Sequence, residues 1–317
     1  MKTSFIIFAV ILTVLVILLI CGLVFFFVSA VSSGEKAKAE TNTYTISEKF
    51  DKINIQSLEA DIIFKQSDNE ECDVVCVEPE KVHHNAVIEN GTLKITVEDK
   101  RQWYERFGSF VSQSITVYLP SDHYDSLEID NKTGNISVPS LFSFESASIH
   151  STTGSITFNS SVNNLLGIET TTGGIRIDGT KAGEMKLSVT TGSADIENVN
   201  CDGDLSINVS TGRTLLTNVS CASVSSEGAT GSITLNDTVA TDYFAISRST
   251  GSVHFQNSDA TRITVKTSTG SVSGTLRSEK IFKASSSTGK ITVPETSKGG
   301  LCEITTTTGS VKIEISE

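Results

Sequence analysis

Two cysteines in the second half of the chain have a spacing that could form a disulfide bond. Cys201 lies nine residues after Gly192, and Cys221 lies nine residues after Gly212. If the two segments stack as neighbouring strands, the cysteines lie about 4.8 Å apart, a spacing that a disulfide accepts. The same position carries alanine after other glycines, so it also suits a small buried side chain, a role that cysteine fills. We favour two free thiols, and the bridge is the alternative.

A second group, Cys72, Cys76, His83 and His84, has the residue types of a zinc site. On a strand, Cys72 and Cys76 lie about 13 Å apart, too far for a disulfide. Neighbouring residues on a strand point to opposite faces, so His83 and His84 are poorly placed to bind one ion together. We therefore interpret these residues as exposed polar groups, and we predict no metal ligand and no cofactor.

Enzymatic chemistry is not indicated by the remaining residues. A β-helical polysaccharide lyase or hydrolase needs acidic and basic side chains that converge on one outer face, whereas the acids here are scattered. The sequence contains no nucleophile elbow, P-loop, dinucleotide fingerprint or calcium-binding repeat. We predict no catalytic residue.

Hydroxyl groups instead recur beside a series of glycines. This row could bind ice or a crystalline polymer, but we interpret it as turn chemistry, because hydroxyls at corners bond to local backbone. The residues are Thr152, Thr171, Thr190, Ser210, Ser249, Ser268, Ser287 and Thr307.

The spacing of these glycines indicates which secondary-structure elements position the residues named above. Their steps are 19 or 20 residues, which is typical of a repeat architecture. Short segments on either side of each glycine alternate apolar and polar residues, as strands with one buried face do. The glycines are Gly134, Gly154, Gly173, Gly192, Gly212, Gly231, Gly251, Gly270, Gly289 and Gly309.

This pattern predicts an all-β, right-handed parallel β-solenoid rather than an array of hairpins. In a solenoid each residue stacks on its counterpart one coil away, which explains the recurring chemistry, and ten coils make a rod of roughly 50 Å. Glycine suits the sharp corner because it tolerates positive φ. Thr214, Ser226 and Gly274 depart from the apolar inward pattern, so we expect those coils to be weaker or distorted.

The start of the chain predicts a membrane anchor. Residues 5–28 form an uncharged run of 24 residues, about 36 Å long as a helix, enough to cross a bilayer. A cleaved signal peptide is the alternative, although its apolar region is usually shorter. The positive-inside rule favours a cytoplasmic tail at residues 1–4 and a bulk outside the cytoplasm. After the span we predict a polar stalk at 29–43, irregular first coils with a cap at 44–126, and regular repeats at 127–317.

Two further surfaces are candidates for contact. Trp103, Tyr104, Phe107 and Phe110 lie between strands; we interpret them as a loop that covers the first coils, with a partner-binding patch as the alternative. At the other end the chain stops soon after Val311, Ile313 and Ile315. We expect this last strand to be an exposed edge that docks end to end with another copy or a partner.

The chain resembles the DUF4097 family of β-strand-repeat proteins, whose members are labelled "putative adhesins". The opening Phe50–Ile53, the stretch Asn90–Ile95 and the Thr-Gly-Ser-Ile/Val repeats carry this resemblance, which covers about Thr43 to Ile315. It implies a β-solenoid of the bacterial cell envelope, and it supplies no catalytic residues.

Together these features predict a single-pass protein of the cell membrane, acting as a non-catalytic adhesin-like or scaffold module. A β-helical carbohydrate-active enzyme or polysaccharide-binding protein is the alternative. The partner is an envelope protein or a glycan. Nucleic acid is excluded by the net charge of −12 and the pI of about 4.9, because nucleic acid attracts clustered Lys and Arg.

Overall fold

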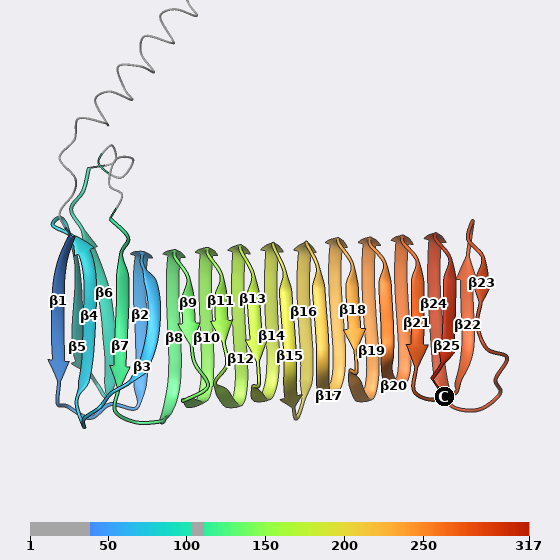
Figure 1. Ribbon diagram of the computed structural model, residues 1–317, viewed down its shortest axis with the longest axis horizontal. Helices are drawn as coiled ribbons and strands as arrows, with labels where there is room; N and C mark the ends of the chain where they lie inside the picture. The colour runs from blue at the N-terminus through green and yellow to red at the C-terminus, as the bar shows by residue number, and fades with distance from the viewer. Residues whose placement is uncertain (1–38, 103–104, 106–110, 317) are drawn as a thin grey trace, which may run out of the picture.

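The described part of the chain is a rod of stacked β-strands. The computed structural model describes residues 39–102, 105 and 111–316. Figure 1 shows the strands running across the long axis of the rod, with the chain advancing coil by coil along it. Within these described residues no α-helix is present, and none therefore has the length and apolar character to cross a membrane. The span predicted at residues 5–28 lies outside them.

Twenty-five strands make up the rod. The first nine are β1 (Ala39–Ile46), β2 (Lys52–Glu59), β3 (Asp61–Gln66), β4 (Cys72–Pro79), β5 (Val82–Glu89), β6 (Thr92–Asp99), β7 (Ser114–Leu119), β8 (His123–Thr133) and β9 (Ile136–Val138). The next eight are β10 (Ser143–Thr153), β11 (Ile156–Phe158), β12 (Ser161–Thr172), β13 (Ile175–Asp178), β14 (Lys181–Thr191), β15 (Ala194–Cys201), β16 (Asp204–Thr211) and β17 (Thr214–Thr230). The last eight are β18 (Ile233–Asn236), β19 (Val239–Thr250), β20 (Val253–Thr269), β21 (Val272–Leu276), β22 (Lys280–Ser286), β23 (Ile291–Thr292), β24 (Gly300–Thr308) and β25 (Val311–Ile315).

Long and short strands alternate, and each kind pairs with its own kind in the next coil. The long strands β8, β10, β12, β14 and β16 pair in parallel and form what we call the broad face. The short strands β9, β11, β13 and β15 pair in parallel and form the narrow face. β15, β17 and β20 continue around a corner and pair with strands of both faces. The predicted parallel β-solenoid, with coils of about 20 residues, is confirmed.

The core consists of columns of equivalent apolar side chains between the two faces. On the broad face, Ile129, Ile149, Ile168, Leu187 and Ile207 are paired in consecutive coils and are at most 3% exposed. Such stacking removes apolar surface from water along the whole rod, which is the main favourable term in folding. The stacking predicted from the glycine register is therefore confirmed.

The recurring glycines form the corner between the broad and narrow faces. The amide of Gly192 donates to the Thr211 carbonyl of the next coil at 2.9 Å. Gly192 has φ of +147°, and a Cβ atom there would lie 1.6 Å from the carbonyl oxygen of Gly173. A side chain is therefore excluded both by the backbone conformation and by the previous coil.

A second corner contains a ladder of amide side chains that the sequence analysis did not predict. Asn198 and Asn218 adopt positive φ of 53° and 54°, a conformation that asparagine tolerates better than most residues. The Asn198 amide donates to Asp178 at 2.8 Å, and the Asn218 amide donates to Asn198 at 2.9 Å. These bonds link one coil to the next on the outside of the rod.

The polar inward residues Thr214 and Ser226 have a partner in the core, which corrects our expectation of simple weak points. The buried Arg248 guanidinium donates to the Ser226 hydroxyl at 2.8 Å and to the Thr214 hydroxyl at 3.3 Å. Gly228 makes room, because a Cβ atom there would lie 2.8 Å from an Arg248 nitrogen. Burial lowers the pKa of Arg248 to about 10.

Gly274 does mark a distortion, as expected. It lies opposite Phe255, and a Cβ atom on it would be 1.7 Å from the Phe255 carbonyl oxygen. The register between β20 and β21 shifts between Phe255 and Ser258, so this coil departs from the regular stacking.

At both ends of the rod the order of the coils differs from the order of the chain. At the C-terminal end β24 lies between β20 and β22, and β25 lies between β21 and β23. At the N-terminal end β2 lies between β6 and β8, and β3 lies between β7 and β9. At each end, therefore, the outer coil is not the one nearest the chain terminus (Figure 1). The coil nearest the terminus, β2–β3 or β24–β25, is inserted one place further in.

This inversion overturns the predicted docking edge. Val311 and Ile313 are each 1% exposed, and Ile315 is only partly exposed, because β25 is paired on both sides. The outermost strands at this end are β22 and β23, whose Ile281 and Ile291 are 42% and 39% exposed. The spacing of the glycines could not show which of the coils β22–β23 and β24–β25 lies outermost, because Gly289 and Gly309 both fit the repeat.

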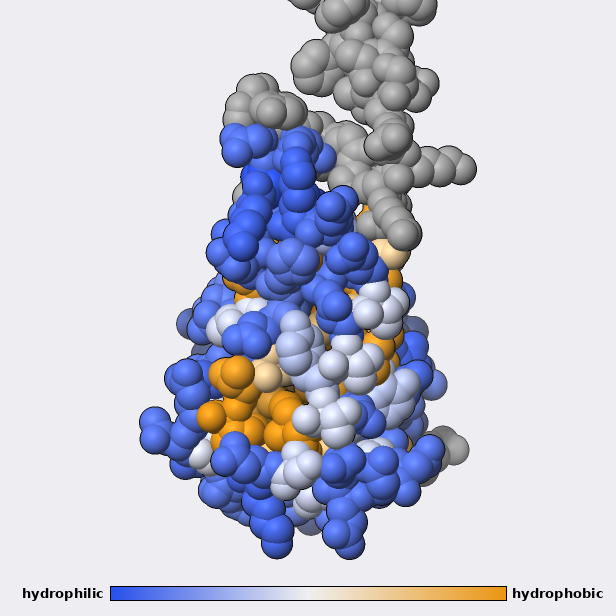
Figure 2. Space-filling model, turned by 90° about the vertical axis from the view of Figure 1, so that its left-hand side faces the viewer, coloured by the Kyte–Doolittle hydropathy of each residue, from blue (hydrophilic) through white to orange (hydrophobic). Residues whose placement is uncertain are grey.

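The N-terminal end is closed by antiparallel strands. β1 pairs with β4, and β4 with β7, as an extension of the narrow face, while β5 pairs with β6 as an extension of the broad face. Figure 2 looks at this end and shows a largely hydrophilic surface with a hydrophobic patch in its lower part. The antiparallel strands cover the core there. β1 begins at Ala39, so residues 39–43, predicted as the end of a polar stalk, belong to a strand instead.

We predict that Gly192→Ala destabilises the fold strongly, while Gly167→Ala does not. The first change places a methyl group against the Gly173 carbonyl at a positive-φ corner, and it should cost about 2–4 kcal/mol of unfolding free energy. At Gly167 the nearest atom to an added Cβ is 3.9 Å away, so the cost should be below about 0.5 kcal/mol. Denaturant unfolding followed by circular dichroism measures both, and equal destabilisation would contradict the corner argument.

Candidate functional site

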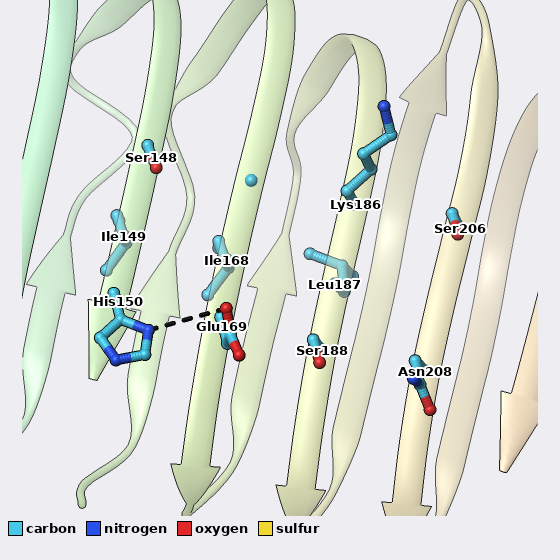
Figure 3. Close-up of a pocket in the computed structure, with 11 residues that line it drawn as sticks. Ser148, Ile149, His150, Ile168, Glu169, Lys186, Leu187, Ser188, Ser206 and Asn208 are labelled. Atoms are coloured by element: carbon cyan, nitrogen blue, oxygen red, sulfur yellow. Dashed lines mark ion pairs between the residues drawn. The ribbon is translucent and has the colours of Figure 1, made fainter. Parts of the chain in front are cut away.

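A shallow groove on the outer surface of the broad face gathers the most varied polar side chains. It has a volume of about 370 Å³ and crosses β10, β12, β14 and β16. Figure 3 shows its residues in two rows that run along the rod, one from Ser148 to Ser206 and one from His150 to Asn208.

The strand register explains why these side chains lie in rows. His150 pairs with Glu169, Glu169 with Ser188, and Ser188 with Asn208, so all four point outward from equivalent positions. In the parallel row, Gly167 lies between Ser148 and Lys186 and has no side chain, which deepens the groove there.

The electrostatics of the groove are those of an exposed surface. His150 Nδ1 lies 3.7 Å from Glu169 Oε2, and the two side chains are 47% and 63% exposed. Lys186 Nζ is 2.9 Å from Glu184, also largely exposed. Ion pairs of this kind are screened by solvent and contribute little to stability, so these residues are available to a ligand.

The chemistry that this groove can perform is hydrogen bonding. Hydroxyl, amide, imidazole and ammonium groups can each bond to sugar hydroxyls or to polar groups of a peptide. Only one carboxylate, Glu169, lines it, whereas cleavage of a glycosidic bond generally needs two carboxyl groups flanking that bond. The groups that line the groove can therefore bind a polar ligand.

A larger cavity, of about 660 Å³, lies near the N-terminal end. Phe50 and Tyr124, which stack with ring centroids 5.6 Å apart, form its apolar part. Glu48, Glu70 and Glu71 line its polar side together with Lys49, so carboxylates outnumber the one ammonium group there.

The predicted hydroxyl ladder lies on the surface. Thr152, Thr171 and Thr190 are exposed, in line with the expected outward column. The hydroxyls that bond to the glycine corner come from the residue just before the outward column, as in Thr267 to the Gly251 carbonyl at 3.2 Å and Thr306 to the Gly270 carbonyl at 3.0 Å. Turn chemistry is therefore performed by an inward column, and the outward column is free to contact other molecules.

Cys201 and Cys221 occupy the stacked column that the sequence predicted. Ala182 pairs with Cys201, and Cys221 pairs with Ala240, which pairs with Ala260. Both cysteines are buried free thiols, and the Cys201 thiol donates to the Gly183 carbonyl at 3.5 Å. Burial raises the pKa of Cys201 to about 11 and that of Cys221 to about 12. The small-residue interpretation, rather than the disulfide, describes this structure.

The interpretation of His83 and His84 as exposed polar residues is wrong for His84. His84 is 1% exposed and faces the core, whereas the His83 side chain is 43% exposed. Cys72 and Cys76 are both buried, on the same face of β4. The contact loop proposed from Trp103, Tyr104, Phe107 and Phe110 lies outside the described residues.

Sequence reasoning missed Glu78, which is completely buried beside His84. One signal was available. Cys72, Val74, Cys76 and Glu78 alternate along one strand, so Glu78 had to share the inward face of the cysteines.

Taken together, the stacked parallel coils and the polar, open outer face define a repeat protein of the β-solenoid class. Within that class, the chain belongs to the family described as Toastrack DUF4097, whose pattern matches residues 50–208 and 200–317. The resemblance stated from the sequence is therefore confirmed.

Solved structures with a similar fold include two that are each described as a "putative adhesin". The protein from Parabacteroides merdae is 18% identical with a TM-score of 0.51, and the match covers 75% of this chain and 96% of that one. The protein from Bacteroides fragilis is 14% identical with a TM-score of 0.46, covering 89% and 100%. At these identities the likeness concerns the fold. No curated protein matches this chain.

We predict that Cys201 and Cys221 react with iodoacetamide only after unfolding. Their burial and raised pKa values keep the thiolate, the reactive form, scarce at pH 8. Mass spectrometry of peptides alkylated without reductant, before and after denaturation, measures this. A peptide pair whose mass is two hydrogens short, and which separates on reduction, would show a bridge instead.

Proposed function

We propose that this protein is a membrane-anchored, non-catalytic β-solenoid that serves as an adhesin-like or scaffold module of the bacterial cell envelope. The observation that carries the proposal is the outer face of the rod. Residues at equivalent positions of successive coils place hydroxyl, amide and charged side chains in straight rows on this face. Among the described residues that line its groove, one is a carboxylate. Such a surface offers many similar contacts rather than one reaction centre.

The family supports this proposal, as does the description of the Parabacteroides merdae structure as a "putative adhesin". The partner that we propose is a glycan or an envelope protein with a row of hydrogen-bonding groups. A polymer with repeating hydroxyls could contact several coils in succession, because the rows repeat at the strand spacing of about 4.8 Å. Several weak contacts on one ligand add to a larger affinity.

We predict that the combined changes His150→Ala, Glu169→Ala and Asn208→Ala weaken glycan binding by about tenfold or more, because hydrogen bonds to the ligand are lost. A glycan array probed with the full-length protein identifies the ligand, and titration with that glycan gives the affinity. The matched control is His254→Ala, which removes an exposed histidine from the narrow face and should leave binding unchanged.

Two outcomes would argue against the proposal. Equal binding by the triple variant and the control would exclude the groove as the contact surface. Cleavage of the bound glycan, followed by release of reducing ends, would favour the alternative of a carbohydrate-active enzyme.

The anchor is tested separately. We predict that the full-length protein sediments with membranes and resists washing with high salt, because residues 5–28 are long and apolar enough to span a bilayer. A chain that begins at Ala39 should stay in the supernatant. Release of the full-length protein by salt alone would mean that the first 38 residues do not anchor it.

A further inference from the structure

Three side chains that can bind metal meet inside the closed N-terminal end of the rod. One ligand atom each of Cys76, Glu78 and His84 lies within 4.8 Å of the other two. Cys76 and Glu78 are 0% exposed, and His84 is 1% exposed. Polar groups are seldom placed so deep in a core without a strong partner, because loss of hydration is costly.

The strands that close the end bring these residues together. Cys76 and Glu78 are two residues apart on β4 and therefore share its inward face. β5 follows after a short turn and extends the opposite face of the rod, so His84 faces β4 across the end of the core. The group therefore consists of Cys76 and Glu78 on β4 and of His84 on the facing strand β5.

Contacts with neighbouring strands hold two of these side chains, Glu78 and His84, in place. Glu78 Oε1 accepts a hydrogen bond from the Asn42 amide at 2.7 Å, and Asn42 belongs to β1. His84 Nε2 lies 3.2 Å from the Ser57 hydroxyl of β2, while its Nδ1 lies 2.6 Å from Glu78 Oε2. The Tyr44 hydroxyl donates to the His84 carbonyl. Metal-binding histidines commonly have one ring nitrogen at the metal and the other bonded to a neighbouring polar group.

We propose that Cys76, Glu78 and His84 form a buried zinc site, with Nδ1 of His84, Sγ of Cys76 and an oxygen of Glu78 as the ligands. A thiolate, a carboxylate and an imidazole are all ordinary ligands of this ion. The fourth position is left for water.

Charge supports this assignment. A thiolate from Cys76 and a carboxylate from Glu78 supply two negative charges, which balance the two positive charges of the ion, while His84 binds as a neutral ring. The site is then neutral overall in a part of the core where an unbalanced charge would be costly.

For Glu78 and His84 the geometry requires only a small adjustment. Atoms that each lie about 2.0–2.1 Å from a tetrahedral zinc ion are roughly 3.3 Å apart. His84 Nδ1 and Glu78 Oε2 are 2.6 Å apart, a hydrogen-bond distance, so the ion replaces the proton between them and separates them by under about 1 Å.

The site would tie together strands that no backbone ladder joins. β4 belongs to the narrow face and β5 to the broad face, and they are linked by the short turn between them and by the contacts of Glu78 with the His84 amide and ring. An ion bound by both strands would fix the end of the rod, and its removal would loosen that end before the regular coils.

The experiment uses the full-length protein purified without a metal-affinity tag and loaded with Zn²⁺ or Co²⁺. We expect about one bound ion per chain after dialysis, and a thiolate-to-cobalt charge-transfer band in the Co²⁺ form. Cys76→Ser should abolish that band and weaken Zn²⁺ binding at least about 100-fold. The matched control is Cys72→Ser, which changes a buried cysteine on the same face of the same strand and should leave both signals intact.

The wild-type protein alone also decides the matter if the variants fail to fold. The charge-transfer band reports thiolate ligation without any substitution, and a chelator should lower the Tm of the loaded protein. A wild-type protein that retains no ion after dialysis and shows no cobalt band overturns the proposal. Loss of the signals in Cys72→Ser with retention in Cys76→Ser would overturn it as well.

Discussion

The parallel ladder of hydrogen bonds between equivalent strands of neighbouring coils is the interaction on which the rest of this structure depends. A single coil is too thin to bury its apolar face, so its stability comes from the coils on either side. The glycine corner permits this stacking, since the Gly173 carbonyl occupies the place that a side chain on Gly192 would need. The apolar columns and the outer polar rows are both consequences of that register.

The same register gives the outer surface its character. Because His150, Glu169, Ser188 and Asn208 follow one another along the rod at equivalent positions, polar groups are spread in rows instead of converging around a deep cleft. Chemistry that needs several groups around one atom is difficult to build on such a face. The residues that do converge are at the irregular N-terminal end, where antiparallel strands fold across the core.

The sequence predicted the regular coils well, because glycine, apolar and hydroxyl residues recur together and each constrains the same register. It could not predict the order of the coils at the ends. Val311 and Ile291 carry the same pattern, and either could pair with Val272, so only the loop geometry decides that Val311 does. The inward position of His84, in contrast, was predictable, because His84 alternates in phase with the apolar residues Val82 and Ala86 along β5.

The inverted order at the two ends has a consequence for how such proteins change length during evolution. β2–β3 and β24–β25 are each held between neighbours on both sides, so each end forms a closed unit that does not rely on any particular coil in the middle. Duplication or deletion of one segment between two equivalent glycines leaves both ends intact and alters the reach of the rod by about 4.8 Å. Homologues should therefore differ by whole coils.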